Sequence, residues 1–218
     1  MKYFKIAVDC IILGYDNHSN QLMILLTRRI NNPSKGEWAL PGGFVTETET
    51  FEETAKAILE RETGFQDIYL RQLNAYSLTD PSEDNRIVSI AYYSLIKFND
   101  IERAEASQSW KWFHFKDYPT LPFDHGTKVL HAIERVRQLV KIEPVVFNLL
   151  PTKFPLNQLQ KVYEELYEKK LDNRNFRKKI KKLSYIQALN EFETNVSHRP
   201  GNLYRFNLEA YQKNLEDY

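Results

Sequence analysis

The chain has 218 residues, of which 42% are hydrophobic and 13% aromatic, a composition that can fill one large or two modest cores and excludes wholesale disorder. The formal net charge of +1 at pH 7 is unevenly spread, because 16 Lys and Arg face 19 Asp and Glu up to residue 140, against 14 and 10 beyond it. The resulting charges of −3 and +4 predict an acidic or neutral first domain followed by a basic second one.

Two apolar, β-branched-rich runs open the chain at residues 6–13 and 22–27, and a polar stretch separates them. This pattern predicts a β-hairpin. Cys10 is the only cysteine, which excludes an intramolecular disulfide and a zinc site of several thiolates; we expect it to be buried in the first strand. Asp9 interrupts the first run, which is too short to span a bilayer and has no cleavage site after it. We therefore expect a cytoplasmic protein with no membrane partner.

Residues 42–65 predict a turn at a pair of glycines, then a helix that ends at a third glycine. The glycine pair 42–43 permits backbone conformations that other residues resist, so a turn is expected there. Thr48 or Thr50 is expected to cap the start of the helix, and Gly64 suits the left-handed position beyond its end.

The same stretch resembles the Nudix box, whose pattern is Gly, five residues, Glu, seven residues, then Arg-Glu-apolar-any-Glu-Glu-any-Gly-apolar. The positions that match this pattern are Gly43, Glu49, Leu59, Glu62, Gly64 and Phe65. Three positions depart from it: Ala57, Ile58 and Arg61 replace the Arg, Glu and Glu of the family.

Two of these departures, at positions 58 and 61, fall on the helix face that binds metal in the family. Positions 58, 61 and 62 are spaced i, i+3 and i+4 and therefore share one face. In Nudix hydrolases this face holds Mg²⁺ against a diphosphate, and Mg²⁺ needs oxygen ligands in near-octahedral order. Here the face offers an alkyl group, a cation and one carboxylate. We predict a degenerate box with Glu49 and Glu62 as residual carboxylates, no metal site, no cofactor and no catalytic residue.

Apolar patterns beyond the box predict the other elements of the first domain. The expected elements are strands at 68–78, 86–98 and 110–113, and a helix at 126–140 whose apolar residues recur at helical spacing. Together with the hairpin and the box helix, they fit the α/β/α sandwich of the Nudix fold.

Pro144 and Pro151 then bracket a short apolar segment, after which the residue composition changes. We place a domain boundary here, with a Nudix-like effector-binding domain at 1–142 and a winged-helix DNA-binding domain at 143–218. The elements expected in the second domain are helices at 156–167 and 173–183, with Asp172 as cap of the second helix, and strands at 185–189 and 203–206. Helix, short turn, basic helix and two-stranded ribbon make a winged helix-turn-helix.

The second of these helices is strongly basic. Phe176, Ile180 and Leu183 form one apolar stripe, and the cationic side chains fall on the opposite side. Between Lys169 and Lys182 there are eight basic residues and one acidic residue, a net charge of +7. A helix of this kind can reach phosphates and base edges in the major groove of DNA.

A Nudix-like domain followed by a winged helix that contains Asp172-Asn173-Arg174-Asn175-Phe176-Arg177-Lys178-Lys179 resembles the Nudix-related transcriptional regulators. That family includes regulators of NAD metabolism that sense ADP-ribose and relatives that sense pentoses such as arabinose. The resemblance covers nearly the whole chain. It implies a homodimeric repressor that binds a double-stranded DNA operator and a sugar-containing small molecule as effector.

Two sets of candidate site residues follow. The candidate DNA-binding residues are Arg174, Asn175, Arg177, Lys178, Lys181, Lys182, His198 and Arg199. The candidate effector-binding residues are Arg28, Gly42, Gly43, Phe44, Asp80, Arg86, Asp124 and His125. Two alternatives stay open: Asn175 lies at a flank of the apolar stripe and can be structural, and Asp124 can serve as the cap of the following helix.

Two rival functions also stay open. The first is a Mg²⁺-dependent Nudix hydrolase of nucleoside diphosphate derivatives, against which the replaced carboxylates at positions 58 and 61 count. The second is an RNA-binding or adaptor protein that uses the basic helix on another partner.

Overall fold

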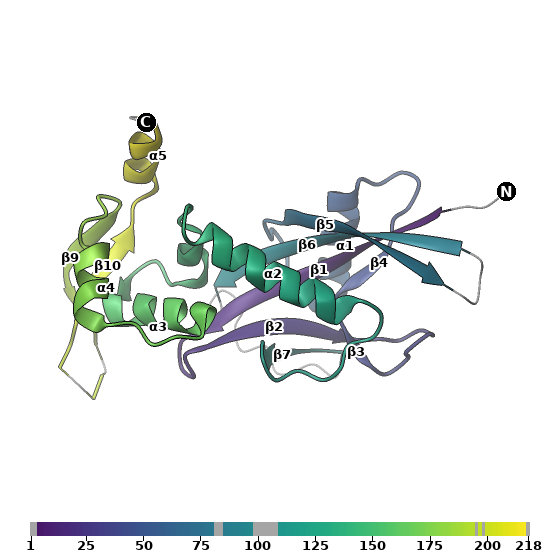
Figure 1. Ribbon diagram of the computed structural model, residues 1–218, viewed down its shortest axis with the longest axis horizontal. Coiled ribbons are helices and arrows are strands. Elements are labelled where there is room, and N and C mark those ends of the chain that lie inside the picture. The colour runs from purple at the N-terminus through teal and green to yellow at the C-terminus, as the bar shows by residue number, and fades with distance from the viewer. Residues whose placement is uncertain (1–3, 81–84, 98–108, 195, 198, 217–218) are drawn as a thin grey trace.

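The computed structural model describes residues 4–80, 85–97, 109–194, 196–197 and 199–216. The molecule is elongated, with a large sheet between two helices at one end and a small winged helix at the other (Figure 1). The elements before residue 142 are β1 (Phe4–Asp16), β2 (Gln21–Arg28), β3 (Trp38–Ala39), β4 (Gly42–Phe44), α1 (Phe51–Thr63), β5 (Arg71–Asp80), β6 (Asn85–Lys97), β7 (Trp110–His114) and α2 (His125–Leu139). After it come η1 (Val145–Leu149), β8 (Phe154–Pro155), α3 (Leu156–Tyr167), α4 (Asn173–Ile180), β9 (Ile186–Phe192), β10 (Asn202–Phe206) and α5 (Leu208–Glu216).

The large sheet is organised around β1. Its order is β3-β2-β1-β6-β5, with β4 paired to β1 and β7 paired to β2. β1 runs parallel to β6 and antiparallel to β2 and β4. Alternate β1 side chains face opposite layers, so that Cys10 and Ile12 pack with α1 while Ile11 and Leu13 pack with α2. The predicted α/β/α sandwich, the hairpin and the buried Cys10 are confirmed.

Both ends of α1 follow the predicted rules. Thr50 is the N-cap, and a capping box forms because its side chain accepts from the Glu53 backbone while the Glu53 carboxylate accepts from the Thr50 backbone. Gly64 ends the helix in the left-handed region at φ 78°. Of the two candidate caps, the structure therefore uses Thr50.

The predicted turn at Gly42 and Gly43 is wrong, because both residues lie in β4 and neither has a positive φ. The reason for glycine at position 42 is close approach. A Cβ there would lie 2.4 Å from Asp9 Oδ1 and 2.8 Å from the Val8 carbonyl oxygen. The absence of a side chain lets β4 pair with β1 directly beside a buried carboxylate.

The winged helix forms its own sheet in the order β8-β10-β9, against which α3 and α4 pack. α3 has the predicted bounds, but α4 ends three residues earlier than predicted. The chain after Ile180 tightens into a turn, in which the Lys182 and Leu183 amides donate to the carbonyls three residues before them. β8 and α5 were not predicted. No helix among the described residues is long and apolar enough to cross a membrane.

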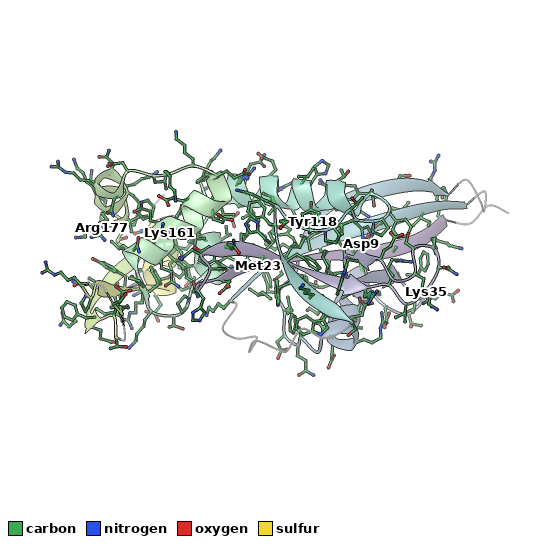
Figure 2. The ribbon with its side chains drawn as sticks, turned by 90° about the horizontal axis from the view of Figure 1, so that it is seen from below. Asp9, Met23, Lys35, Tyr118, Lys161 and Arg177 are labelled. Carbon is green, nitrogen blue, oxygen red and sulfur yellow. The ribbon has the colours of Figure 1, made fainter. Side chains whose placement is uncertain are left out.

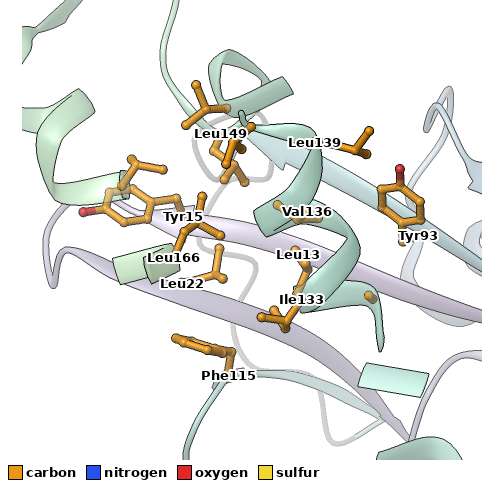
Figure 3. Packing of buried hydrophobic residues seen from close by; sticks show 14 of the residues in the cluster. Leu13, Tyr15, Leu22, Tyr93, Phe115, Ile133, Val136, Leu139, Leu149 and Leu166 are labelled. Atoms are coloured by element: carbon orange, nitrogen blue, oxygen red, sulfur yellow. The ribbon is translucent and has the colours of Figure 1, made fainter. Parts of the chain in front are cut away.

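One apolar core joins the large sheet to the winged helix. Leu13 and Leu22 of the sheet, Val136 of α2, Leu149 of η1 and Leu166 of α3 belong to a single cluster of buried side chains (Figure 3). The two parts therefore share a core where the sequence predicts a boundary. The division between residues 142 and 143 stays a prediction.

We predict that Gly42→Ala lowers the free energy of unfolding by about 1–3 kcal/mol, because the new methyl overlaps fixed atoms of β1. Gly126→Ala is the matched control, since nothing lies within 4 Å of its Cβ position in α2. Alanine there should be neutral or stabilising by up to about 1 kcal/mol. Urea denaturation of both variants checks this, and equal stabilities would refute the close-approach argument.

Candidate nucleic-acid interface and effector site

Helix α4 is held from its apolar side. Phe176 and Ile180 are buried in the shared core, and the Phe176 ring packs edge-on against Tyr163 of α3 at 5.6 Å between centroids. Asp172 caps α4, accepting from the Asn175 amide at 2.8 Å, as predicted. Burial of the apolar stripe leaves the basic side chains of α4 in solvent.

The turn between α3 and α4 is fixed by a hydrogen-bond network around the buried side chain of Glu164. Its Oε1 accepts from the Leu171 amide at 2.9 Å and from Gln160 Nε2 at 3.0 Å. Burial raises the pKa of Glu164, but these hydrogen bonds and the charge of Lys170 outweigh burial and hold the pKa below its usual value. The network sets the direction in which α4 leaves the turn.

The candidate DNA-binding residues that the structure describes lie on α4, in the turn after it and before β10. Arg174, Asn175, Arg177 and Lys178 are exposed on α4, and Lys181 and Lys182 are exposed in the turn after it. Arg177 lies at the far end of the long axis from Lys35 (Figure 2). Arg199 is exposed before β10. His198 lies outside the described residues.

The Nudix-box face of α1 does not suit Mg²⁺. Ile58 is buried, with its Cδ1 3.1 Å from the Cβ position of Gly43, so a methyl group fills the space beside β4. Glu49 Oε2 accepts from the hydroxyls of Thr46 and Thr54 at 3.0 and 3.1 Å. Arg61 donates to Glu62 Oε1 at 3.1 Å. In the described part of the chain, no group of three or more His, Cys, Asp and Glu side chains could hold a metal ion.

A buried polar cluster lies on the opposite face of the sheet, under the start of α2. Lys128 is fully buried, and its ammonium lies 2.7 Å from Asp9 Oδ2, 2.7 Å from Asp124 Oδ1 and 3.1 Å from Ser89 Oγ. Ser89 also donates to Asp9 Oδ2 through a short hydrogen bond. Figure 2 shows Asp9 inside the sheet end of the molecule.

His125 links the cluster to the segment that leads into β4. The Leu40 amide donates to His125 Nδ1 at 3.1 Å, so the ring carries its proton on Nε2, 3.4 Å from Asp9 Oδ1. Burial raises the pKa of Asp9, but the hydrogen bond from His125 and the charge of Lys128 outweigh burial and hold that pKa well below its usual value. With two carboxylates, one ammonium and a neutral imidazole, the cluster carries a net charge of −1.

The Asp124 carboxylate pairs with Lys128 and lies at the edge of the cluster. Asp124 occupies the N-cap position of α2, but its side chain makes no capping bond. Its Oδ1 faces Lys128 as an ion pair without the alignment of a hydrogen bond. The side chain keeps 17% of its surface exposed, which makes it the solvent-facing edge of the cluster.

The candidate effector residues lie in several separate parts of the structure. Gly42, Asp124 and His125 meet around Asp9. Arg28 lies at the end of β2, where its Nε donates to the Gly36 carbonyl at 3.0 Å. Phe44 is 58% exposed on β4, with the Lys5 ammonium 5.8 Å from its ring centre.

Gly43 and Arg86 lie on the α1 side of the sheet. Gly43 faces Ile58 on the α1 side of the sheet. Arg86 is exposed at the start of β6 and shares the α1 side by strand alternation with Val88 and Ile90. The side chain of Asp80, the last residue of β5, lies outside the described part of the structure.

Comparison with known proteins agrees with this geometry. Residues 3–133 match the NUDIX domain family, and residues 146–206 match the NrtR DNA-binding winged helix domain. The chain belongs to the NUDIX family. Its second part is an NrtR-type winged helix domain, which confirms the resemblance to Nudix-related transcriptional regulators.

Relatives of this NUDIX chain include both regulators and an enzyme. The ADPR responsive transcriptional repressor NtrR of Acinetobacter baylyi is 29% identical over 215 residues, which are 96% of this chain and 84% of that protein. The ADP-ribose pyrophosphatase of Methanocaldococcus jannaschii is 35% identical over 120 residues, 55% of this chain and 68% of the enzyme. Shewanella oneidensis NrtR, crystallised with a 27mer DNA, is 29% identical and has a TM-score of 0.80 over 95% of both chains.

Sequence reasoning on this NUDIX chain missed Asp9, Ser89 and Lys128 as members of the polar cluster. Two signals were present. Asp9 is the one charge inside an apolar strand, and Lys128 follows Asp124 by one helical turn on the face that carries Ala132 and Val136. A charged residue at a core position needs a partner, and these two are each other's partners.

We predict that Lys128→Met destabilises the NUDIX part by about 3–5 kcal/mol, because it leaves Asp9 buried without its cation. Because the folded-state pKa of Asp9 is depressed, its carboxylate stabilises the fold above its unfolded pKa of about 4, and this stability is lost as the pH falls through the folded pKa. Lys128→Met should raise that folded pKa and move acid unfolding to higher pH.

Urea unfolding of Lys128→Met between pH 3 and pH 7 measures both effects. Lys141→Met, an exposed lysine just after α2, should change stability by no more than about 0.5 kcal/mol. Asp9→Asn/Lys128→Met should recover part of the loss, since the unpaired charge is gone. If Lys128→Met behaves like Lys141→Met, the cluster does not hold α2.

Proposed function

We propose that the chain is a transcriptional repressor that binds duplex DNA through α4 and the β9–β10 wing, and that a molecule containing a five-carbon sugar binds its NUDIX domain as effector. The observation that carries the proposal is the exposed basic face of α4, whose apolar face is buried against α3. An exposed cationic helix at the second position of a helix-turn-helix is the geometry of major-groove recognition.

The residues of α4, of the turn after it and of the segment before β10 have distinct roles in this proposal. Arg174, Arg177 and Lys178 bind phosphates or guanine edges, and Asn175 can read adenine because its side chain is exposed. Lys181 and Lys182, in the turn after α4, contact the backbone of the duplex. Arg199 lies in the segment before β10, where a wing touches a groove or a phosphate. The chain acts as a homodimer, whose two recognition helices fit half-sites about one DNA turn apart.

The effector contacts the solvent-facing edge of the buried polar cluster. The Asp124 side chain keeps 17% of its surface exposed, and a sugar hydroxyl can donate a hydrogen bond to a carboxylate at this edge. The cluster carries a net charge of −1, which suits neutral hydroxyl groups and disfavours a phosphate at this point. ADP-ribose and free pentoses both present the hydroxyl groups of a five-carbon sugar. The Acinetobacter baylyi relative, an ADPR responsive repressor, supports ADP-ribose, while the unsuited metal site supports a pentose such as arabinose.

We infer that the chain does not hydrolyse nucleoside diphosphate derivatives. Hydrolysis in this family needs carboxylates on the α1 face, where Ile58 fills the space beside β4 and Arg61 adds a positive charge. Glu49 is engaged by two threonine hydroxyls. The rival hydrolase function keeps one supporting fact, the 35% identity to an ADP-ribose pyrophosphatase.

We predict that Arg177→Ala weakens binding to a duplex selected with the wild-type chain from a random library. The slope of log K against log salt should become shallower by about 0.9, the value for one lost phosphate contact. Lys35→Ala is the matched control, because Lys35 is an exposed cation at the opposite end of the molecule (Figure 2). Fluorescence anisotropy at several salt concentrations measures both. An unchanged slope in Arg177→Ala, or equal affinity for single-stranded RNA, would contradict the assignment.

We predict that only one of two effector classes raises the melting temperature of the chain. A ligand at one hundred times its dissociation constant adds about 2.7 kcal/mol of stability. ADP-ribose, AMP, D-ribose and L-arabinose are compared by thermal shift with EDTA present, since binding should need no metal. Asp124→Asn should weaken binding of the active compound. Release of AMP from ADP-ribose with Mg²⁺, lost in Glu62→Gln, would support the hydrolase instead.

A further inference from the structure

Three side chains of the NUDIX domain contact the last turn of α3 and its C-cap, just before the turn that leads into the recognition helix. Arg137 of α2 donates from Nε to the Leu166 carbonyl at 2.5 Å, and its Nη2 pairs with Glu168 Oε1. Lys116, beyond β7, lies 3.4 Å from Glu168 Oε2. His114 Nε2 lies 2.8 Å from Glu165 Oε1.

The Arg137 contact has a specific effect on the end of α3. Leu166 is among the last residues of the helix, whose carbonyls have no partner within the helix, so Arg137 supplies the missing donor. Glu168 is the C-cap and adopts a left-handed conformation at φ 54°, which is uncommon for a residue other than glycine. Arg137 and Lys116 both hold the side chain of this residue. The NUDIX domain thus fixes the point where the chain turns toward α4.

α2 connects this point to the polar cluster. Lys128 and Arg137 lie nine residues apart in the same helix, which places them about 14 Å apart along its axis. Between them, Ile133 and Val136 pack in the shared core that also contains Leu166 of α3 (Figure 3). A helix packed along its whole length moves as a rigid element, so a shift at its first turn reaches its last turn.

We propose that Arg137 is a positioning residue that fixes the orientation of α4 and couples it, through α2, to the effector cluster at Asp124 and Lys128. The inference rests on the proposed function. Arg137 does not belong to the DNA-binding face, since it is engaged with Leu166 and Glu168. An effector changes DNA affinity only by binding the two orientations of α4 differently, and the coupling must be reciprocal.

The test measures DNA affinity and its salt dependence for Arg137→Gln, with the selected duplex. We expect affinity to fall about 5- to 20-fold, a range within the usual span of coupling free energies, while the slope of log K against log salt stays unchanged because no phosphate contact is lost. Arg135→Gln is the matched control, because it removes the same charge from an exposed position of α2. It should leave both the affinity and the slope at their wild-type values.

A double-mutant cycle separates positioning from general damage. Glu168→Gln removes the other side of the contact, and the double variant Arg137→Gln/Glu168→Gln should bind DNA no more weakly than either single variant. If Arg137→Gln lowers the melting temperature, Glu168→Gln measures the same contact from an exposed residue. Additive losses, or an Arg137→Gln variant equal to Arg135→Gln, would overturn the proposal.

DNA-binding measurements with effector present test the coupling between the effector cluster and α4. With saturating ADP-ribose, and separately with L-arabinose, wild-type DNA affinity should change by about 5- to 150-fold for the compound that binds. In Arg137→Gln the change should shrink to less than about threefold, while the dissociation constant of the compound without DNA stays within about twofold of wild type. A full response in Arg137→Gln would overturn the coupling. A wild-type chain that binds no duplex would refute the proposed function, whereas a wild-type chain that binds DNA and ignores both compounds would refute the sensing part and the coupling together.

Discussion

The ammonium of Lys128, buried between two carboxylates, fixes the position of α2 on the large sheet. A lone buried charge is unstable, so Lys128 requires Asp9 on β1 and Asp124 on its own helix. Apolar packing is not directional and would allow α2 to slide along the sheet. The ion pairs of Lys128 and the His125 contact to Leu40 fix one position of α2 on the sheet. The position of α2 then determines where Arg137 meets the winged helix. Everything between the sheet and α4 depends on that register.

The α1 face is filled by an apolar side chain at Ile58, whereas basic side chains gather on α4. In a hydrolase the α1 face must stay polar and open, because the metal and the diphosphate meet there. Here Ile58 fills that face and adds to the core on the α1 side, which strengthens the sandwich as a scaffold. In the proposed function, the effector meets the other face of the sheet, where a polar cluster lies under α2.

Local rules predicted the parts of the fold that depend on neighbours in sequence. The capping box at Thr50, the stop at Gly64 and the apolar stripe with Phe176 and Ile180 all follow from spacing and propensity. The errors arise where distant segments meet. Gly42 is glycine because a strand 33 residues earlier brings Asp9 against it, which no local pattern reveals. The contacts among Asp9, Ser89 and Lys128 join β1, β6 and α2. The sequence around each residue alone does not reveal these contacts.

The winged helix shares its apolar core with the NUDIX domain. A unit of about 60 residues buries only about 60% of its unfolded surface and is marginally stable alone. In this chain its buried residues, from Leu149 to Tyr204, continue the core that begins on β1. The orientation of α4 is therefore part of the packing of the whole molecule rather than a property of the helix-turn-helix. A ligand that shifts α2 acts on that packing directly, which gives a small effector a physical route to DNA without contact between the two.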